Sequence, residues 1–342
     1  MRRIPSLDGF RAISIALVLI SHSRFSNGFP FQNSEMLLSN VGSLGVTVFF
    51  VISGFLITYL LLTEEAERKE INLKYFYIRR VLRIFPVYFL YCIFVFALKN
   101  YESIVITTNN FIHIVSFTTN FDKHIFSTFQ HFWSLSVEEQ FYLIWPISIV
   151  LFRKNLKVVI IAFLLLSSIF RITAYKFPHW EISNLNSFFD YSDSIFIGAL
   201  GGILFFENKQ PYFLRFFKSY FSQIALIGVI ILLRYSQGMG KLGYITIPFG
   251  NTIISFCILY IIFNYIIISE GSIFKFLNNK IIIHIGVLSY SIYIWQQFFL
   301  YGQTGFYRIF PYNHLIVYSV ALCSYYFWEL PFLKLKKRFT KY

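Results

Sequence analysis

Two ionisable side chains share one side of a predicted helix near the N-terminus. Arg11 and His22 lie eleven residues apart, which at about 100° per residue is three turns and roughly 20°. Their separation along the helix axis is therefore about 16 Å. If this helix lies in lipid, it offers a cation near one membrane surface and a base nearer the other, and ionisable groups in lipid usually serve a function. The alternative is a snorkelling arginine and a histidine hydrogen-bonded between helices.

Three arginines within about one and a half helical turns suit an anionic ligand. Arg79 and Arg83 share a helix face, and Arg80 lies between them in the sequence. A planar guanidinium group binds phosphate oxygens through two parallel hydrogen bonds, so the cluster is typical of a site for a phosphorylated cytosolic ligand. The alternative is the ordinary excess of basic residues on the cytosolic side of a membrane helix.

Three carboxylates could complete a site or stabilise the helices that carry them. Glu138 and Glu139 are predicted to stand at the outer start of a membrane span, where the helix dipole stabilises negative charge. Glu138 could instead hold His22 in the tautomer needed for proton abstraction. Glu329 is predicted near the cytosolic end of the last span, where it could pair with one of the arginines or form a purely structural buried ion pair.

The elements that must position these residues are membrane-spanning helices. Of the 342 residues, 56% are hydrophobic and only 13% are charged, whereas about a quarter of the residues in soluble domains are charged. We therefore predict an all-α, polytopic integral membrane bundle of about ten transmembrane helices, each long enough to cross about 30 Å of hydrocarbon. The predicted spans lie near residues 10–26, 42–62, 84–99, 140–152, 156–173, 191–206, 220–233, 249–268, 285–300 and 313–330.

The basic residues are distributed as in a membrane protein, not as in a protein that binds nucleic acid. The formal net charge is +14, but the lysines and arginines gather in alternate loops, as the positive-inside rule predicts. With the N-terminus inside, roughly two thirds of the 30 basic residues fall in cytosolic segments. Both termini are therefore predicted to be cytosolic, and no nucleic-acid partner is expected.

The longest predicted outer loop runs from about Lys99 to Val137 and is long enough to cap a site from outside. It contains three histidines and ends in a mixed polar and aromatic stretch. The histidines are His113, His124 and His131, and the closing stretch is Trp133-Ser134-Leu135-Ser136.

Other polar and thiol side chains are interpreted as structural. Asp190 and Asp193 precede the stretch Gly198-Ala199-Leu200-Gly201-Gly202, whose small residues allow helices to approach closely. The three cysteines, Cys92, Cys257 and Cys323, all lie in predicted spans, so we expect no disulfide framework and no metal site.

Several ordered segments resemble the acyltransferase-3 family, membrane acyltransferases that commonly O-acetylate surface polysaccharides. The resemblance rests on Leu7-Asp8-Gly9-Phe10-Arg11-Ala12-Ile13 followed by His22, on Phe49 to Ile57, on Tyr77 to Pro86, on His131 to Glu138, and on Ser289-Tyr290-Ser291-Ile292-Tyr293-Ile294-Trp295. It covers nearly the whole chain. Members often carry a histidine after the last motif, whereas Gln296-Gln297 follows here. A glutamine can hydrogen-bond but cannot transfer a proton, which puts a proton-transfer role at that position in doubt.

The resemblance implies a single membrane domain over residues 1–342 in the bacterial cytoplasmic membrane, with no appended soluble domain. Some relatives append an extracytoplasmic esterase-like domain; if transfer needs one, it must be a separate periplasmic transferase. The implied reaction moves an acetyl or other acyl group from cytosolic acetyl-coenzyme A, a co-substrate and not a bound cofactor, to a hydroxyl group. The implied acceptor is a cell-surface or lipid-linked polysaccharide such as O-antigen or capsule.

The resemblance also suggests roles for particular residues. Catalysis is assigned to His22, Arg11 and Glu138, with His22 taking the proton from the acceptor. The donor is assigned to Arg79, Arg80, Arg83 and Glu329, and the acceptor side to His131, Trp133, Ser136 and Tyr290. The alternative from another class is a transporter, such as a flippase for lipid-linked sugars, which would also show about ten helices and a few intramembrane charges.

Overall fold

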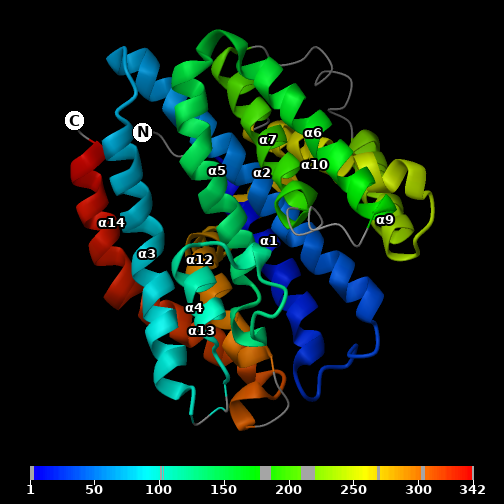
Figure 1. Ribbon diagram of the computed structural model, residues 1–342, viewed down its shortest axis with the longest axis vertical. Helices are drawn as coiled ribbons and strands as arrows, with labels where there is room; N and C mark the ends of the chain where they lie inside the picture. Colours follow the sequence, from blue (N-terminus) through cyan, green and yellow to red (C-terminus); the bar gives the residue numbers. More distant parts are fainter. Residues whose placement is uncertain are drawn as a thin grey trace.

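The computed structural model describes residues 4–100, 102, 104–177, 186–208, 220–267, 270–301 and 305–340. These residues are almost entirely helical, and the helices form one bundle (Figure 1). The first half comprises α1 (Leu7–His22), α2 (Glu35–Arg68), α3 (Leu73–Leu98), α4 (Thr108–Val115), α5 (Phe132–Leu151) and α6 (Leu156–Lys176). The second half comprises α7 (Asn186–Phe206), α9 (Tyr220–Gly238), α10 (Gly243–Ile267), α11 (Ser272–Leu277), α12 (Lys280–Leu300), α13 (Tyr312–Cys323) and α14 (Leu330–Lys336).

Among the described residues, eight helical segments are long and apolar enough to cross a membrane. They are α2, α3, α6, α7, α9, α10, α12 and the continuous segment from α13 through α14. The 16-residue α1 and the 20-residue α5, which carries two glutamates, run beside them in the same bundle (Figure 1). The predicted polytopic helical membrane fold is thus confirmed.

Both ends of the chain lie at the same end of the bundle, at the upper left of Figure 1. We call this the inner end, because the basic loops predict that it faces the cytosol. The opposite end, which carries α4 and the loop after α12, is the outer end (Figure 1).

The arginine cluster lies on a helix and not in a loop. The sequence predicted an inward loop near residues 63–83 that contains helix, and the structure confirms the helix: α2 continues to Arg68 and α3 begins at Leu73. The side chain of Asn72 caps α3 by accepting a hydrogen bond from the Tyr75 backbone N–H at 2.9 Å. The guanidinium groups are therefore borne by a regular helix at the inner end.

The helix that carries the paired glutamates begins earlier than the sequence predicted. The sequence placed its start near residue 140, whereas α5 begins at Phe132. Glu138 and Glu139 consequently lie within the helix, beyond its first turn, and the predicted helix-capping role for them is wrong. The reason is that residues 132–139 mix polar and charged side chains with apolar ones, which hides the helix from a hydropathy criterion.

Glycines set the closest approach between two central helices, α2 and α7. A Cβ atom placed on Gly54 would lie 1.9 Å from the Ile195 carbonyl oxygen, and one on Gly198 would lie 2.1 Å from the Val51 carbonyl oxygen. Neither distance is possible for a real side chain, so the two backbones meet directly. The first turn of α1 is held in the same way against α12, because a Cβ on Gly286 would lie 1.9 Å from the Asp8 carbonyl oxygen.

The last span contains a π-helix, Ser324–Glu329, between α13 and α14. Such segments often occur at functional sites, because the extra residue in the turn redirects the side chains that follow. Here the π-helix ends at Glu329, whose side chain is fully buried in the bundle.

Candidate active site

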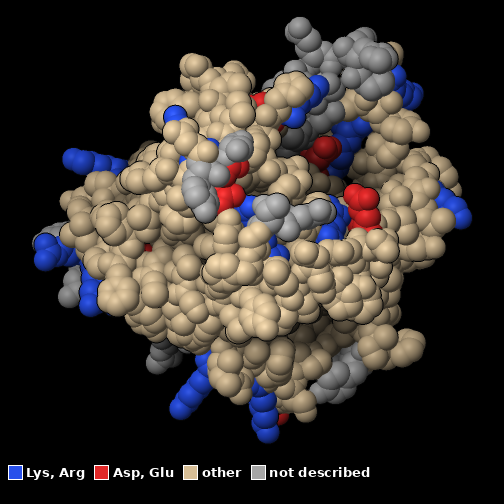
Figure 2. Space-filling view, turned by 90° about the horizontal axis from the view of Figure 1, so that it is seen from below, with Lys and Arg blue, Asp and Glu red and all other residues tan. Residues whose placement is uncertain are grey.

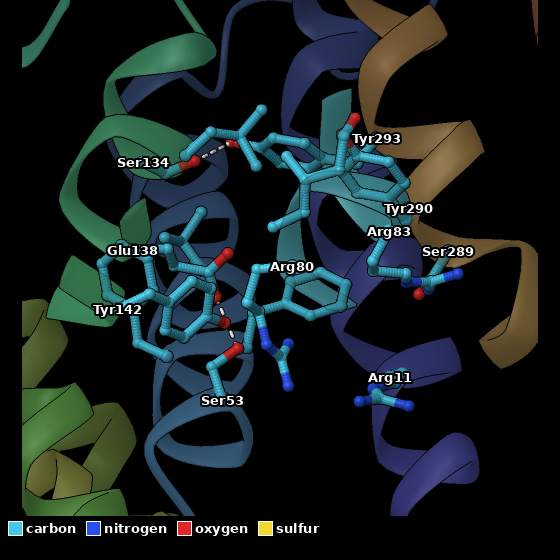
Figure 3. Close-up of a pocket in the computed structure, with 15 residues that line it drawn as sticks. Arg11, Ser53, Arg80, Arg83, Ser134, Glu138, Tyr142, Ser289, Tyr290 and Tyr293 are labelled. Atoms are coloured by element: carbon cyan, nitrogen blue, oxygen red, sulfur yellow. Dashed lines mark hydrogen bonds between the residues drawn. The ribbon is translucent and has the colours of Figure 1, made fainter. Parts of the chain in front are cut away.

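A cavity of about 120 Å³ lies at the junction of α1, α2, α3, α5 and α12. We call it the arginine cavity, because Arg11, Arg80 and Arg83 all line it (Figure 3). Its other polar walls are Ser53, Ser134, Glu138, Tyr142, Ser289, Tyr290 and Tyr293. Motifs from five separate parts of the sequence therefore meet around one small space.

Arg83 forms the ion pair that the sequence predicted for Glu329. Its guanidinium donates to the Glu329 carboxylate, which also accepts a hydrogen bond from Ser291 at 2.6 Å. The Tyr290 ring lies 5.5 Å from the Arg83 guanidinium carbon. Arg83 is therefore held in place by a buried carboxylate while it also lines the cavity.

Arg80 is the arginine with spare hydrogen-bonding capacity. It packs over the rings of Tyr142 and Phe76, at 5.1 and 5.5 Å. Its Nε atom is buried and has no hydrogen-bond partner among the described residues. Arg11, at the inner end of α1, donates to Asp8 at 3.0 Å and contributes a third cation to the cavity.

A second space of about 340 Å³ lies further toward the inner end, and we call it the inner vestibule. Arg80 lines both spaces, so the vestibule and the arginine cavity share a wall. Arg79 turns into the vestibule, where it pairs with Glu64 at 2.6 Å and donates to the Phe339 carbonyl oxygen at 3.0 Å. The vestibule is lined by Leu60, Leu61, Glu64, Glu67, Arg68, Phe76, Arg79, Arg80 and Lys336.

Glu138 lines the arginine cavity but does not contact His22. Its carboxylate accepts a hydrogen bond from the Ser53 hydroxyl of α2, and Tyr142 lies beside both (Figure 3). The structure therefore places Glu138 near the arginines, and the contact considered between Glu138 and His22 is not made.

His22 is oriented by a glutamine that the sequence analysis did not consider as its partner. The His22 Nδ1–H donates to Gln296 Oε1 at 2.7 Å, so in the neutral ring the lone pair is on Nε2. Gln296 is fully buried, and the neighbouring Gln297 donates to the Ser127 carbonyl oxygen at 2.8 Å. The only signal in the sequence that Gln296 has a special role was its departure from the family pattern. That departure did not reveal that the amide faces His22 on α1.

His22 does not line the arginine cavity, although Arg11 on the same helix does. The two are nevertheless linked through α12. Tyr293 lines the cavity, and Gln296 follows it by three residues, which is a rise of about 4.5 Å along the helix. The outer end of the cavity therefore reaches to about one helical turn from the group that holds His22.

Two residues assigned to the acceptor side lie beyond the cavity toward the outer end. His131, only 2% exposed, donates from Nε2 to the Ile294 carbonyl oxygen at 3.1 Å. The Trp133 ring lies 4.5 Å from the ring of Tyr191 and 6.1 Å from that of Phe50. His131 thus contacts α12 two residues before Gln296, and Trp133 belongs to an aromatic cluster between α5, α2 and α7.

The other two residues assigned to the acceptor side lie elsewhere. Tyr290 lines the arginine cavity beside Arg83 and donates to the Ile84 carbonyl oxygen at 2.7 Å. Ser136 is fully buried and hydrogen-bonds with the hydroxyl group of Thr119 at 2.8 Å, which anchors the outer loop to α5. The structure does not bring these two side chains together with His131 and Trp133.

Comparison with known proteins identifies the family to which the chain belongs. A family model described as an acyltransferase domain matches residues 4–328. The chain is 29% identical to O-acetyltransferase OatA of Staphylococcus aureus strain NCTC 8325 over 97% of its own length and 58% of that relative, and OatA of strain COL gives the same values. It thus spans under two thirds of the length of these relatives, and no solved structure matches it. Because the family model covers nearly all of the sequence, including every motif at the arginine cavity, the chain belongs to the acyltransferase-3 family.

Proposed function

We propose that this protein moves an acetyl group from cytosolic acetyl-coenzyme A to a hydroxyl group of a cell-surface or lipid-linked polysaccharide. The observation that carries the proposal is that Arg80 lines two adjacent spaces. One is the basic vestibule at the inner end, and the other is the small cavity lined by three arginines. The bacterial relatives named O-acetyltransferases support the same reaction class. With donor access from the cytosol, the membrane concerned is the bacterial cytoplasmic membrane.

The inner vestibule suits the nucleotide end of the donor. Coenzyme A carries several phosphate groups, and the vestibule presents Arg68, Arg79, Arg80 and Lys336 against Glu64 and Glu67. Guanidinium groups bind phosphate oxygens with two parallel hydrogen bonds, and the unpartnered Nε of Arg80 has capacity for one more. The thioester end of the donor would then enter the arginine cavity past Arg80.

His22 is the proposed base. Because Gln296 holds the proton on Nδ1, the Nε2 lone pair is available to accept the proton of an acceptor hydroxyl. The hydroxyl oxygen then attacks the thioester carbonyl carbon, the carbon–sulfur bond breaks, and coenzyme A leaves as the thiol after regaining a proton. Arginines near the carbonyl oxygen would stabilise the negative charge that develops on it.

Two aromatic rings line the arginine cavity close to the part of α12 that leads to Gln296. Phe49 and Tyr293 both line the arginine cavity, and their ring centroids lie 6.3 Å apart. For direct transfer the acyl group must reach the level of Gln296, and we propose that these rings move aside to admit it. A base in the correct position usually contributes about 10² to 10⁴ in rate. His22 can make this contribution only if the thioester and the acceptor hydroxyl group come within its reach during turnover.

The test uses the purified chain in lipid nanodiscs with labelled acetyl-coenzyme A and a polysaccharide acceptor. Wild type should consume the thioester and label the glycan, whereas His22→Ala should lose transfer and keep donor binding. Arg80→Gln should weaken donor binding by roughly tenfold or more, because a charge-assisted bond to phosphate is lost.

Arg153→Gln is the matched control for Arg80→Gln, because Arg153 also lies at the inner end but pairs with Glu65 outside both spaces. It should bind the donor as wild type does. Movement of a lipid-linked sugar across the membrane without thioester consumption would instead establish a transporter, and full transfer by His22→Ala would remove that residue from the mechanism.

A further inference from the structure

A second group of buried charges lies between α2, α6, α7, α9 and α10, apart from the arginine cavity. In one half of this group, Arg171 of α6 donates to the Asp193 carboxylate of α7 at 2.9 Å, and Thr252 donates to the same oxygen at 2.7 Å. Arg171 also donates to the Pro248 carbonyl oxygen at 2.9 Å. This cation is therefore neutralised by a carboxylate, and a structural role accounts for it.

Arg234 of α9, the other cation of the group, hydrogen-bonds only to neutral groups, although the Asp193 carboxylate is near enough to interact with it electrostatically. It lies one turn from the outer end of α9 and is 7% exposed. Its guanidinium donates to Thr47 Oγ1 at 2.7 Å, to Asn251 Oδ1 at 3.2 Å and to Gln237 Oε1 at 3.3 Å. Within the described ranges no carboxylate forms an ion pair with it, and its Nε atom is buried without a partner.

A buried guanidinium group that shares its nearby carboxylate, Asp193, with Arg171 can accommodate a further anion. The group stays protonated in proteins, so it cannot escape the cost of burial by losing its charge. Neutral hydrogen bonds compensate that cost only in part, and ionisable groups within membrane bundles usually mark a functional site. The free Nε–H is a donor still available to a ligand.

Arg234 is connected to the reaction site by one short stretch of α2. Thr47, which accepts its hydrogen bond, precedes Phe50 by one helical turn, and Phe50 lines the arginine cavity. The ring of Tyr191 on α7 lies 6.5 Å from that of Phe50 and 4.5 Å from that of Trp133. Aromatic faces beside amide and hydroxyl groups are the usual surroundings of a bound sugar, because they match its apolar faces and its hydroxyl groups.

We propose that Arg234 binds an anionic group, a carboxylate or a phosphate, on the acceptor glycan, while Trp133 and Tyr191 contact the adjoining sugar ring. The inference rests on the proposed function and adds the chemical class of the acceptor to it. It places the anion near the outer end, opposite to the donor vestibule. The outer face is hollowed, and basic and acidic side chains are visible within the hollow (Figure 2).

The experiment measures equilibrium binding of three matched oligosaccharides to the full chain in nanodiscs made of neutral lipid. One probe is neutral, the second carries a hexuronate carboxylate, and the third carries a sugar phosphate. Wild type should bind at least one anionic probe roughly 10- to 100-fold more tightly than the neutral parent, as expected for hydrogen bonds to a charged group. Comparison of the second and third probes distinguishes a carboxylate from a phosphate.

Arg234→Gln, which keeps hydrogen-bonding capacity but loses the charge, should remove the preference for the anion without changing affinity for the neutral probe or for acetyl-coenzyme A. Arg234→Lys should keep part of the preference and serves if the glutamine variant does not fold. Lys241→Gln is the control for general attraction, because Lys241 is an exposed cation just beyond the same end of α9. It should behave as wild type.

Equal binding of all three probes by wild type, or an unchanged preference in Arg234→Gln, would overturn the proposal. Because binding is measured without turnover, the result is independent of the donor reaction. A protein that shows the anion preference but never consumes acetyl-coenzyme A would retain this site and lose the proposed function instead.

Discussion

At the scale of single residues, the orientation of His22 depends on an amide. Gln296 accepts the Nδ1–H of His22 and so fixes which nitrogen is free, but an amide cannot take up the proton that His22 would acquire. If His22 acts as the proposed base, that proton must leave by way of Nε2, to the departing thiol or to water. The proposed role of Gln296, which follows the Trp295 motif, is therefore to orient the imidazole.

Replacing Gln296 tests this role. Gln296→Leu leaves the buried Nδ1–H without an acceptor and allows the wrong tautomer, so transfer should fall by roughly 10- to 100-fold with unchanged affinity for the donor. Gln296→Glu, which keeps an acceptor in place, should retain more activity than the leucine variant. Initial rates and donor binding, measured on the same preparations, separate the two effects; equal rates in Gln296→Leu and wild type would refute the orienting role.

The ion pair of Arg83 and Glu329 gives a second prediction at this scale. Arg83→Met leaves the fully buried Glu329 carboxylate without its cation, which should cost about 3–5 kcal/mol of stability. Adding Glu329→Gln should recover most of that loss, because no buried charge is then unpaired. Thermal unfolding in detergent micelles measures both. If the double variant is less stable than Arg83→Met, the pair does not act as described.

At the scale of elements, the sequence predicted the helices better than their partners. Hydropathy located the spans, and the basic loops oriented them, because both signals are local. The start of α5 was missed because Glu138 is accommodated by Ser53 of α2, a contact across 85 residues that no local pattern records. The same limit applies to His22, whose partner Gln296 is 274 residues away in the sequence. The pairing of Glu329 with an arginine could be predicted, because both side chains were expected near the cytosolic side of the membrane.

The contact of α2 with α7 gives a prediction for a helix crossing. Gly54→Ala would place a methyl group 1.9 Å from the Ile195 carbonyl oxygen, so the helices must separate. We expect a loss of about 1–3 kcal/mol in stability, the usual cost of overpacking. Gly228→Ala is the matched control, because a Cβ on Gly228 of α9 meets no atom within 4 Å. Similar melting temperatures for the two variants would show that the crossing tolerates a wider spacing.

At the scale of the whole molecule, charges are arranged along the membrane normal. The inner vestibule and its basic side chains lie at the inner end, the three arginines of the cavity lie deeper, and Arg234 lies near the outer end. For the proposed function, such an order would let a cytosolic donor and an external acceptor approach from opposite sides.

The small volume of the arginine cavity has a consequence for the length of the acyl chain. Ligand pockets usually enclose about 300–1,000 Å³, whereas this one holds about 120 Å³ between the walls of five helices. It should therefore select short acyl chains. Acetyl and propionyl thioesters should react, and octanoyl thioester should not. Phe49→Ala, which shortens a wall, should shift the cut-off to longer chains, and competition between thioesters of graded length would record it.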